Sequence, residues 1–240
     1  MTIEAAKTGT DRPRAVVSWS SGKDSAFALH EVRARGDLEV VGLLTTVTEA
    51  FGRVSMHGVR ESLLDQQAAA TGLPLYKVAI PSPCPNEVYE RAMATMVGRL
   101  RSEGVSRMVF GDLFLEDIRA YRESKLKGTG MDPVFPLWGR PTDRLAEEMI
   151  DAGLDARVAA LDPRRMPKSF AGRRFDRGFL SDLPREVDPC GERGEFHTCV
   201  VAGPMFDRSI PVEPGDVVER DGFVFADLVP TEPTRASRSP

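Results

Sequence analysis

The sequence predicts an α/β protein that has a parallel, doubly wound, Rossmann-like sheet and a smaller α+β domain toward its C-terminus. Short apolar runs alternate with longer amphipathic runs over residues 14–112, as expected for βαβ units. Gly36 and Gly72 follow two of the amphipathic runs, where a helix commonly ends. A Gly- and Pro-rich stretch at residues 128–143 then separates this pattern from shorter, hairpin-like runs, so we expect a second architecture beyond it.

Each expected element has its own local signal. Residues 38–47 (LEVVGLLTTV) are almost all apolar or β-branched, as in a central parallel strand that is covered on both faces. Val88, Ala92, Met96 and Leu100 recur every four positions and mark one face of a helix. The remaining expected strands are 14–19, 75–80, 106–112, 156–161 and hairpin strands within 196–203 and 208–228, and the remaining helices are 24–35, 58–71 and 143–152.

These signals divide the chain into four parts. We expect a disordered tail at residues 1–13, a first domain at 14–138, an α+β domain at 139–230 and a disordered tail at 231–240, which is rich in Pro, Ser, Thr and Arg. A polar segment of this kind cannot bury enough apolar surface to fold by itself.

Composition narrows the class of protein. The formal net charge of −4 argues against a nucleic-acid partner that is held by bulk electrostatics. Three widely spaced cysteines, Cys84, Cys190 and Cys199, form no CxxC pair, which favours a reducing, cytoplasmic compartment without a disulfide framework. No apolar stretch reaches the roughly 18 residues that a membrane span needs, so we expect no membrane association.

The stretch SWSSGKDSAF lies where the first expected strand turns into the first expected helix. Backbone N–H groups at a helix N-terminus bind anions, Gly22 permits close approach, and Lys23 supplies a cation, while Asp24 suits an accompanying Mg²⁺. The GxxxxGK motif followed by Ser or Thr is absent, and a helix start capped by Ser20 or Ser21 is the alternative. The candidate phosphate-binding residues are Ser18, Ser20, Ser21, Gly22, Lys23, Asp24 and Ser25.

Two further segments carry polar candidates. Gly111 and Asp112 end the fourth expected strand, at the sheet edge where open parallel sheets bind ligands; Asp112 could hold Mg²⁺ or cap the next helix. The segment GERGEFHT brings together Glu192, Glu195 and His197, which suit metal or ammonia binding or general-base chemistry. Cys190 lies nearby, but no base for it is evident, so we interpret it as a packed side chain.

Five segments resemble one known family. SSGKDS resembles the PP-loop (SGGKDS or SGGxDS) of the N-type ATP pyrophosphatases, with Ser21 in place of the first glycine. The segments MHGV, VFGDLFLEDIRAYRE, VFPLWG and DPCGERGEFHT resemble, in the same order, signatures of the diphthine–ammonia ligase-like branch. Together these matches span residues 14–212.

The resemblance implies a nucleotide α-hydrolase-type fold and an ATP-dependent, amide-forming ligase. A carboxylate would be adenylated, with release of pyrophosphate, and then attacked by ammonia; the acceptor is diphthine, as in the family, or another small-molecule or protein carboxylate. The implied cofactors are ATP and Mg²⁺, with adenine near residues 44–46. The implied roles are catalytic for Lys23, Asp24, Asp112 and Glu195, nucleotide-binding for the phosphate loop, Thr45, His57 and Gly111, metal-binding for Asp24 and Asp112, and substrate-binding for Glu116, Glu192 and His197.

Two other functions stay open. A PP-loop enzyme that modifies tRNA would be expected to carry CxxC pairs or a basic extension, and neither is visible. A non-catalytic ATP-binding protein is favoured by Ser21 alone and opposed by the retained Lys23, Asp24 and Asp112. The oligomeric state is undecided, with a homodimer as one option.

Overall fold

The structure is a computed structural model, and it describes residues 12–50, 52–54 and 58–231. Five parallel strands form the central sheet in the order β4-β2-β1-β5-β6, and the two-residue β3 (Arg53–Val54) pairs antiparallel with the end of β2. The strand bounds are β1 Arg14–Ser18, β2 Glu39–Thr48, β4 Leu75–Ile80, β5 Arg107–Val109 and β6 Asp132–Val134. The strand order reverses at β1, because β2 lies on one side of it and β5 on the other.

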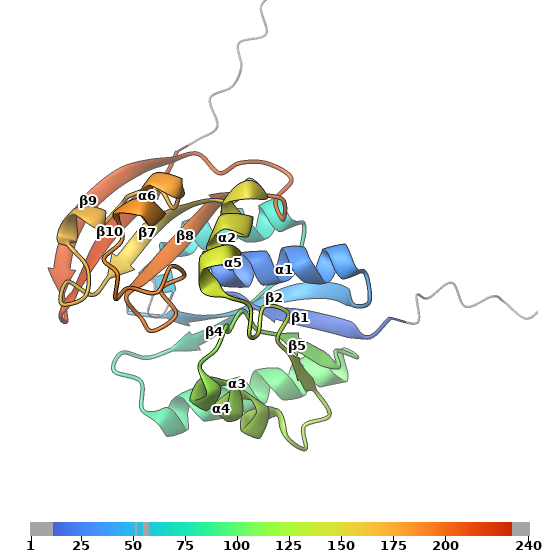
Figure 1. Cartoon of the computed structure of the whole chain (residues 1–240). Helices are drawn as coiled ribbons and strands as arrows, with labels where there is room; N and C mark the ends of the chain where they lie inside the picture. The colour runs from blue at the N-terminus through green and yellow to red at the C-terminus, as the bar shows by residue number, and fades with distance from the viewer. Residues whose placement is uncertain (1–11, 51, 55–57, 232–240) are drawn as a thin grey trace, which may run out of the picture.

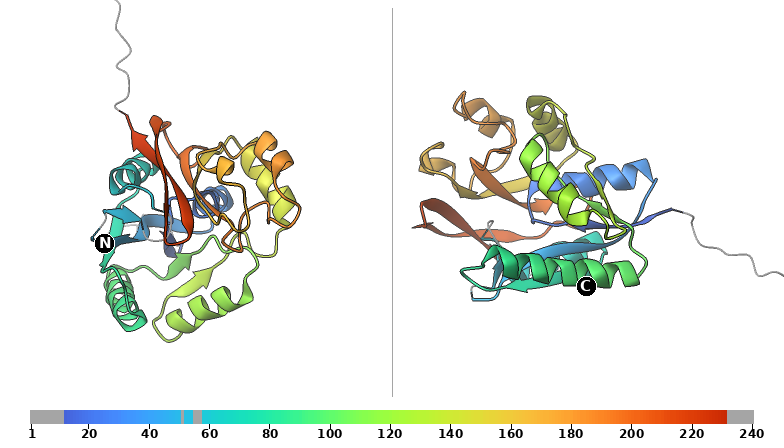
Figure 2. Two further views of the ribbon diagram at one scale, coloured as in Figure 1. Left: turned by 90° about the vertical axis from the view of Figure 1, so that its left-hand side faces the viewer. Right: turned by 90° about the horizontal axis from the view of Figure 1, so that it is seen from below.

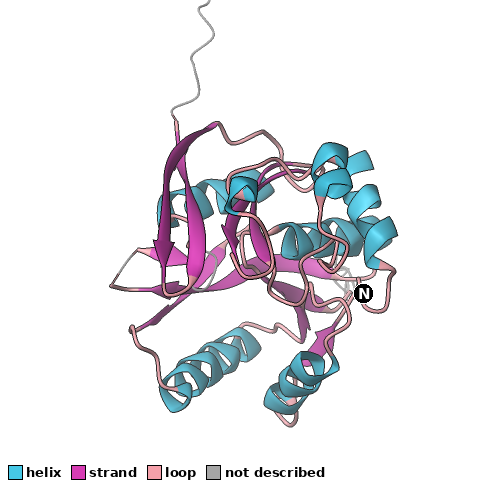
Figure 3. Cartoon of the chain, turned by 60° about the vertical axis from the view of Figure 1, so that its left-hand side comes forward, coloured by secondary structure: helices cyan, strands magenta, loops and turns pink. Residues whose placement is uncertain are grey.

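Helices cover both faces of this sheet (Figures 1 and 3). α1 (Lys23–Arg35) and α2 (Glu61–Thr71) lie on one face, and α3 (Asn86–Ser102) and α4 (Glu116–Leu126) lie on the other. α1 and α2 end at Gly36 and Gly72, which adopt left-handed φ angles of 67° and 71°. Glycine populates this region without steric cost, so both expected helix ends are confirmed.

The C-terminal part of the chain forms a second lobe, residues 141–231, around an antiparallel sheet of order β8-β7-β10-β9. Its strands are β7 Asp155–Leu161, β8 Phe196–Ala202, β9 Val212–Arg220 and β10 Phe223–Pro230. The helical segments are α5 Thr142–Asp151, α6 Arg177–Asp182 and a 3₁₀ turn at Lys168–Phe170. The views in Figure 2 show this lobe on the α1 side of the parallel sheet, away from α3 and α4.

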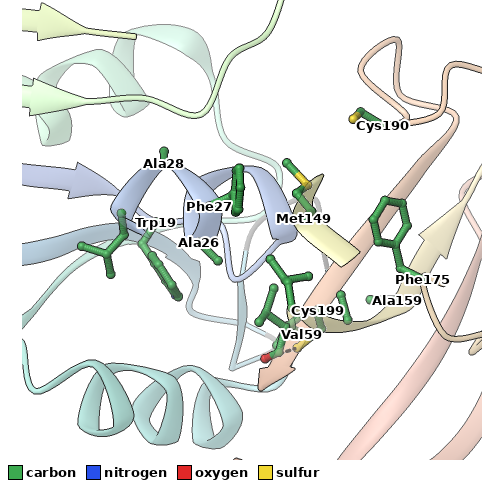
Figure 4. Close-up of a cluster of buried hydrophobic side chains, with 14 of the residues drawn as sticks. Trp19, Ala26, Phe27, Ala28, Val59, Met149, Ala159, Phe175, Cys190 and Cys199 are labelled. Carbon is green, nitrogen blue, oxygen red and sulfur yellow. Dashed lines mark hydrogen bonds between the residues drawn. The ribbon is translucent and has the colours of Figure 1, made fainter. Parts of the chain in front are cut away.

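Two hydrophobic clusters hold these layers together. The larger one joins the α1 and α2 face of the sheet to the second lobe; in Figure 4 Trp19, Phe27, Met149 and Cys199 converge from β1's end, α1, α5 and β8. The smaller one, which includes Val97, lies between the other face and helices α3 and α4. The second lobe is therefore part of the packing of one face only.

The predicted fold class is confirmed: a mostly parallel α/β sheet is followed by a smaller antiparallel lobe. The helix expected after Asp112, which had no assigned bounds, is α4. The sequence missed β3, β6 and α6, which are only 2, 3 and 6 residues long, too short to generate a periodic signal. The four proposed parts and their boundaries stay a prediction, and most of both terminal tails lies outside the described residues. Within the described part of the chain, no helix combines the length and apolarity that a membrane span requires.

Candidate functional site

The loop between β1 and α1 lies at the point where the strand order reverses. This is the place where open α/β sheets bind ligands. Ser21 adopts a φ of 70° and is followed by Gly22, the N-cap of α1, which has an extended backbone and no capping side chain. Ser21 therefore adopts the left-handed conformation in which L-residues are disfavoured and glycine is not. The PP-loop glycine that Ser21 replaces would fit this backbone.

Strand β8 of the second lobe holds this loop in place through hydrogen bonds. The Val200 N–H donates to the carbonyl of Ser21 at 2.9 Å, and the Thr198 hydroxyl accepts from the Lys23 N–H at 3.0 Å. The N-terminus of α1 thus receives its side-chain cap from a residue 175 positions away. The second lobe is consequently a structural component of the loop.

Lys23 is the first residue of α1, and its side chain extends toward the second lobe. Its ammonium donates to both carboxylate oxygens of Asp24, at 3.0 and 2.9 Å, and to the carbonyl of Cys190. It also lies 5.7 and 5.3 Å from the ring centroids of Phe175 and Phe196. Burial lowers the pKa of Lys23, but the negative charge of Asp24 and its neighbours outweighs burial, so the pKa is raised overall and the ammonium stays charged.

The loop between β5 and α4, residues 110–115, forms another side of the site. Asp112 receives two hydrogen bonds from Arg122 of α4, at 2.7 and 3.3 Å. The Leu113 N–H donates to the Glu192 carboxylate at 2.8 Å. An added Cβ at Gly111 would lie 2.7 Å from the carbonyl carbon of Asp24 and 2.8 Å from the Ser25 nitrogen. Only a glycine lets this loop approach the first turn of α1 so closely.

Residues 188–195 of the second lobe form a further side of the site. The Asp188 carboxylate accepts from the N–H groups of Cys190 and Glu192 and from the hydroxyl of Thr142, and so it fixes the turn that presents Glu192. Glu195 is almost fully buried and lies 3.6 Å from Arg165, and its Oε2 has no hydrogen-bond partner. An unpaired buried carboxylate oxygen is costly, so this atom is a candidate ligand contact.

A cavity of about 1010 Å³ opens beside the loop, between the parallel sheet and helices α3 and α4. Ser18, Ser20, Thr45 and His197 line the end next to the loop, and apolar side chains such as Phe110 line the wall. The Thr45 hydroxyl is buried and has no hydrogen-bond partner. A mostly apolar cavity with a few converging polar groups is typical of a small-molecule site.

Two side chains of this site have strongly shifted pKa values. Burial, together with the charges of Asp24 and Asp112, raises the pKa of Glu192 to about 7. Burial, together with the charge of Lys23, lowers the pKa of His197 to about 4. At neutral pH Glu192 is therefore poised between its two protonation states, and His197 is an uncharged imidazole. Such shifts are common in functional sites.

The structure brings most of the predicted site residues together. The phosphate loop, Gly111, Asp112 and Glu192 lie at the junction of the two lobes, and Thr45 and His197 line the adjoining cavity. Glu195 lies in the second lobe, where its carboxylate contacts the Asp188 N–H and Arg165. Glu116 is exposed in the first turn of α4 and does not line that cavity. His57 lies outside the described residues. α4 has Leu115 as its N-cap, so Asp112 does not cap it.

Sequence reasoning missed three residues that the structure places at this site. Gln67 contacts the phosphate loop, Arg122 pairs with Asp112, and Asp188 fixes the turn before Glu192. Gln67 had a signal, since it lies at the apolar spacing of α2 with Leu63 and Leu64. Arg122 had none, because its pairing depends on the tertiary fold.

The described residues fit a magnesium ion only if it arrives with a nucleotide. No group of three or more His, Cys, Asp or Glu side chains in that part of the chain could hold a metal. Asp24 and Asp112 provide carboxylate oxygens, each already paired with a cationic side chain. One or two carboxylates plus phosphate oxygens are the usual ligands of nucleotide-bound Mg²⁺, so this donor set is adequate for that purpose.

Known proteins resemble this chain over most of its length. The family model of the diphthamide synthase N-terminal domain matches residues 13–133, and the family model of the diphthamide synthase C-terminal domain matches residues 141–225. Diphthine–ammonia ligases from Bos taurus and Homo sapiens are each 28% identical over 86% of this chain and 85% of their own length. The enzyme from Danio rerio is 27% identical over 86% of this chain and 89% of its own length. The chain belongs to the diphthamide synthase family.

Proposed function

We propose that this protein is an ATP-dependent amide-forming ligase that adenylates a carboxylate and transfers ammonia to it. The observation that supports this most directly is the glycine-like loop at the N-terminus of α1, next to a cavity large enough for a nucleotide. The family's curated relatives are diphthine–ammonia ligases, so diphthine is the acceptor that we propose to test first.

In the first step, an oxygen of the acceptor carboxylate attacks the α-phosphorus of ATP. The bond to the β-phosphate oxygen breaks, and pyrophosphate leaves as the acyl-adenylate forms. The loop, the positive end of the α1 dipole and Lys23 bind the leaving pyrophosphate. Ser20 and Ser25, whose hydroxyls lie 3.1 Å apart, provide further donors. Adenine occupies the apolar part of the cavity, near Thr45.

In the second step, ammonia attacks the acyl carbon, and AMP leaves with the bonding electron pair. Glu192 projects from the second lobe toward the Asp112 loop and has a pKa near neutrality, so it suits a proton acceptor for the attacking nitrogen. Glu195, with its unpaired buried oxygen, is the second carboxylate that could contact the nitrogen donor.

Mg²⁺, when bound with ATP, would neutralise charge on the phosphates. Asp24 and Asp112 are the side chains of the described residues that would hold it. Arg122 donates two hydrogen bonds to the Asp112 carboxylate and so restricts its orientation.

The decisive experiment supplies the purified protein with α-labelled ATP, Mg²⁺, ammonium chloride and elongation factor 2 that carries diphthine. We expect AMP and pyrophosphate to form in proportion to an amidated acceptor, detected by mass spectrometry. Formation of ADP would contradict the adenylation step. Formation of AMP without amidation of this acceptor would contradict diphthine as the substrate and retain the adenylating activity.

A further inference from the structure

Gln67 of α2 has a fully buried side-chain amide that contacts the phosphate loop. Its Nε2 donates to the carbonyls of Val200 at 2.7 Å and Ser21 at 3.1 Å. Its Oε1 accepts from the indole N–H of Trp19 at 3.0 Å. One side chain from outside the loop therefore contacts two residues of the loop, Trp19 and Ser21, and the strand of the second lobe that lies against it.

These contacts converge on the one described residue of the loop that has a disfavoured backbone conformation. Ser21 has a φ of 70°, and its carbonyl accepts from both Gln67 and the Val200 N–H. The Ser21 hydroxyl is buried without a hydrogen-bond partner, so it provides no compensation of its own. A non-glycine residue persists in this region only where the surroundings fix it.

We propose that Gln67 is a positioning residue that holds Ser21 in the glycine-like conformation and thereby keeps the phosphate loop ready to bind ATP. The inference rests on the proposed function only in requiring that this loop binds ATP. Without the Gln67 amide, the Ser21 carbonyl keeps one of its two donors, and Ser21 can relax toward negative φ. That relaxation would displace Gly22 and the N-terminus of α1, where the phosphates bind.

A merely structural role for Gln67 makes a different prediction. Loss of a buried amide would then lower the stability of the fold and leave the ATP affinity of the folded molecules unchanged. A positioning role lowers the affinity of folded molecules, and it also predicts a specific rescue. In the Ser21→Gly background the loop adopts the same φ without strain, so Gln67 should matter much less.

The experiment measures the dissociation constant of a fluorescent ATP analogue with Mg²⁺, well below the unfolding temperature of each variant. We expect Gln67→Leu to bind about tenfold more weakly than the wild type, as loss of a buried hydrogen bond and of loop order implies. Gln66→Leu, a half-buried neighbour on the same helix, should bind as the wild type does. In the Ser21→Gly background, we expect Gln67→Leu to weaken binding by less than about threefold.

Equal losses of affinity in the two backgrounds would overturn the inference, and so would an unchanged affinity of Gln67→Leu. Should Gln67→Leu fail to fold, Gln67→Glu keeps the acceptor for Trp19 and removes the second donor, and it is then measured in both backgrounds. Failure of both variants to fold even with Ser21→Gly would also contradict the inference, because Gln67 would then support the fold independently of Ser21. A wild-type protein that binds no ATP would overturn the proposed function and, with it, this inference.

Discussion

The face of the parallel sheet that carries α1 and α2 is packed against the second lobe, whereas the face that carries α3 and α4 encloses a cavity of about 1010 Å³. The difference is visible in the helices themselves. α1 buries seven of its residues, Lys23 and Ser25 among them, but α3 buries only Val97 and Leu100 and α4 only Leu126.

This contrast suggests that the two faces of the sheet have different roles in the site. Contacts from the packed face fix the loop that would hold phosphates, since Gln67, Thr198 and Val200 all reach it from that side. The cavity face has room for the rest of a nucleotide. Substitutions on the packed face should therefore alter stability and binding together, and those on the cavity face should separate the two.

The largest difference in the free energy of unfolding is expected between two substitutions that each break a lysine–carboxylate pair, one on each face. Lys23→Met removes the buried ammonium that pairs with Asp24 and the Cys190 carbonyl. We expect the free energy of unfolding to fall by about 3 kcal/mol, the lower end for a broken buried pair, because Asp24 is partly exposed. Lys125→Met on the cavity face breaks an exposed pair with Glu90 and should change little. Urea unfolding of both variants checks this, and similar losses would contradict the contrast.

Two glycine substitutions, one at the phosphate loop and one on the cavity face, extend the comparison of the two faces. Gly111→Ala places a Cβ within 2.8 Å of the Asp24 and Ser25 backbone, so we expect a loss of about 2 kcal/mol by overpacking, together with weaker ATP binding. Gly98→Ala on α3 meets open space and should raise stability by about 1 kcal/mol, as expected at a helix interior. Chemical unfolding measures both values. A tolerated Gly111→Ala would mean that the two loops are not held as closely as described.

A pH series tests the junction itself. The pKa of Glu192 is raised to about 7 in the folded protein, so between its unfolded value near 4.3 and about 7 the folded state binds more protons than the unfolded state. The contribution of Glu192 to stability should therefore fall as pH rises through this window, and Glu192→Gln should remove that contribution. The measurement is the free energy of unfolding of both proteins from pH 4.5 to 8.

His197 provides the opposite sign as a control. Its pKa is lowered to about 4, so its contribution to stability is lost as pH falls from its unfolded value near 6.5 toward 4. Below about pH 6.5 the two contributions oppose each other, so Glu192→Gln should leave a stability that rises with pH there, and His197→Gln should leave one that falls. A Glu192→Gln profile parallel to that of the wild type would contradict the raised pKa.

The smallest effect on stability is expected at Thr45, on the cavity face. Thr45→Val removes a buried hydroxyl that has no hydrogen-bond partner, so the fold should lose no stability. If this hydroxyl contacts adenine or ribose, ATP affinity should fall about five- to tenfold, the effect of one hydrogen bond. Titration of the ATP analogue and urea unfolding separate the two effects. Unchanged affinity would place the nucleotide elsewhere in the cavity.

The elements that arise from local physical chemistry were predictable from the order of the residues alone. The order of strands and helices follows from hydrophobic periodicity, and the ends of α1 and α2 follow from Gly36 and Gly72. The candidate loop followed from residues that adjoin one another in the chain, between Ser18 and Ser25. The Gln67 signal, a polar side chain at an apolar helical position, was also present but did not indicate a partner.

The contacts that hold the site together join residues far apart in the chain and became evident only in the folded protein. The Thr198 hydroxyl reaches the Lys23 N–H across 175 positions, Glu192 reaches Leu113 across 79, and Gln67 reaches Ser21 across 46. Contacts at such separations depend on how the two lobes pack, and local pattern carries no information about them. The same is true of the left-handed conformation of Ser21, which its surroundings maintain against the local preference of a serine.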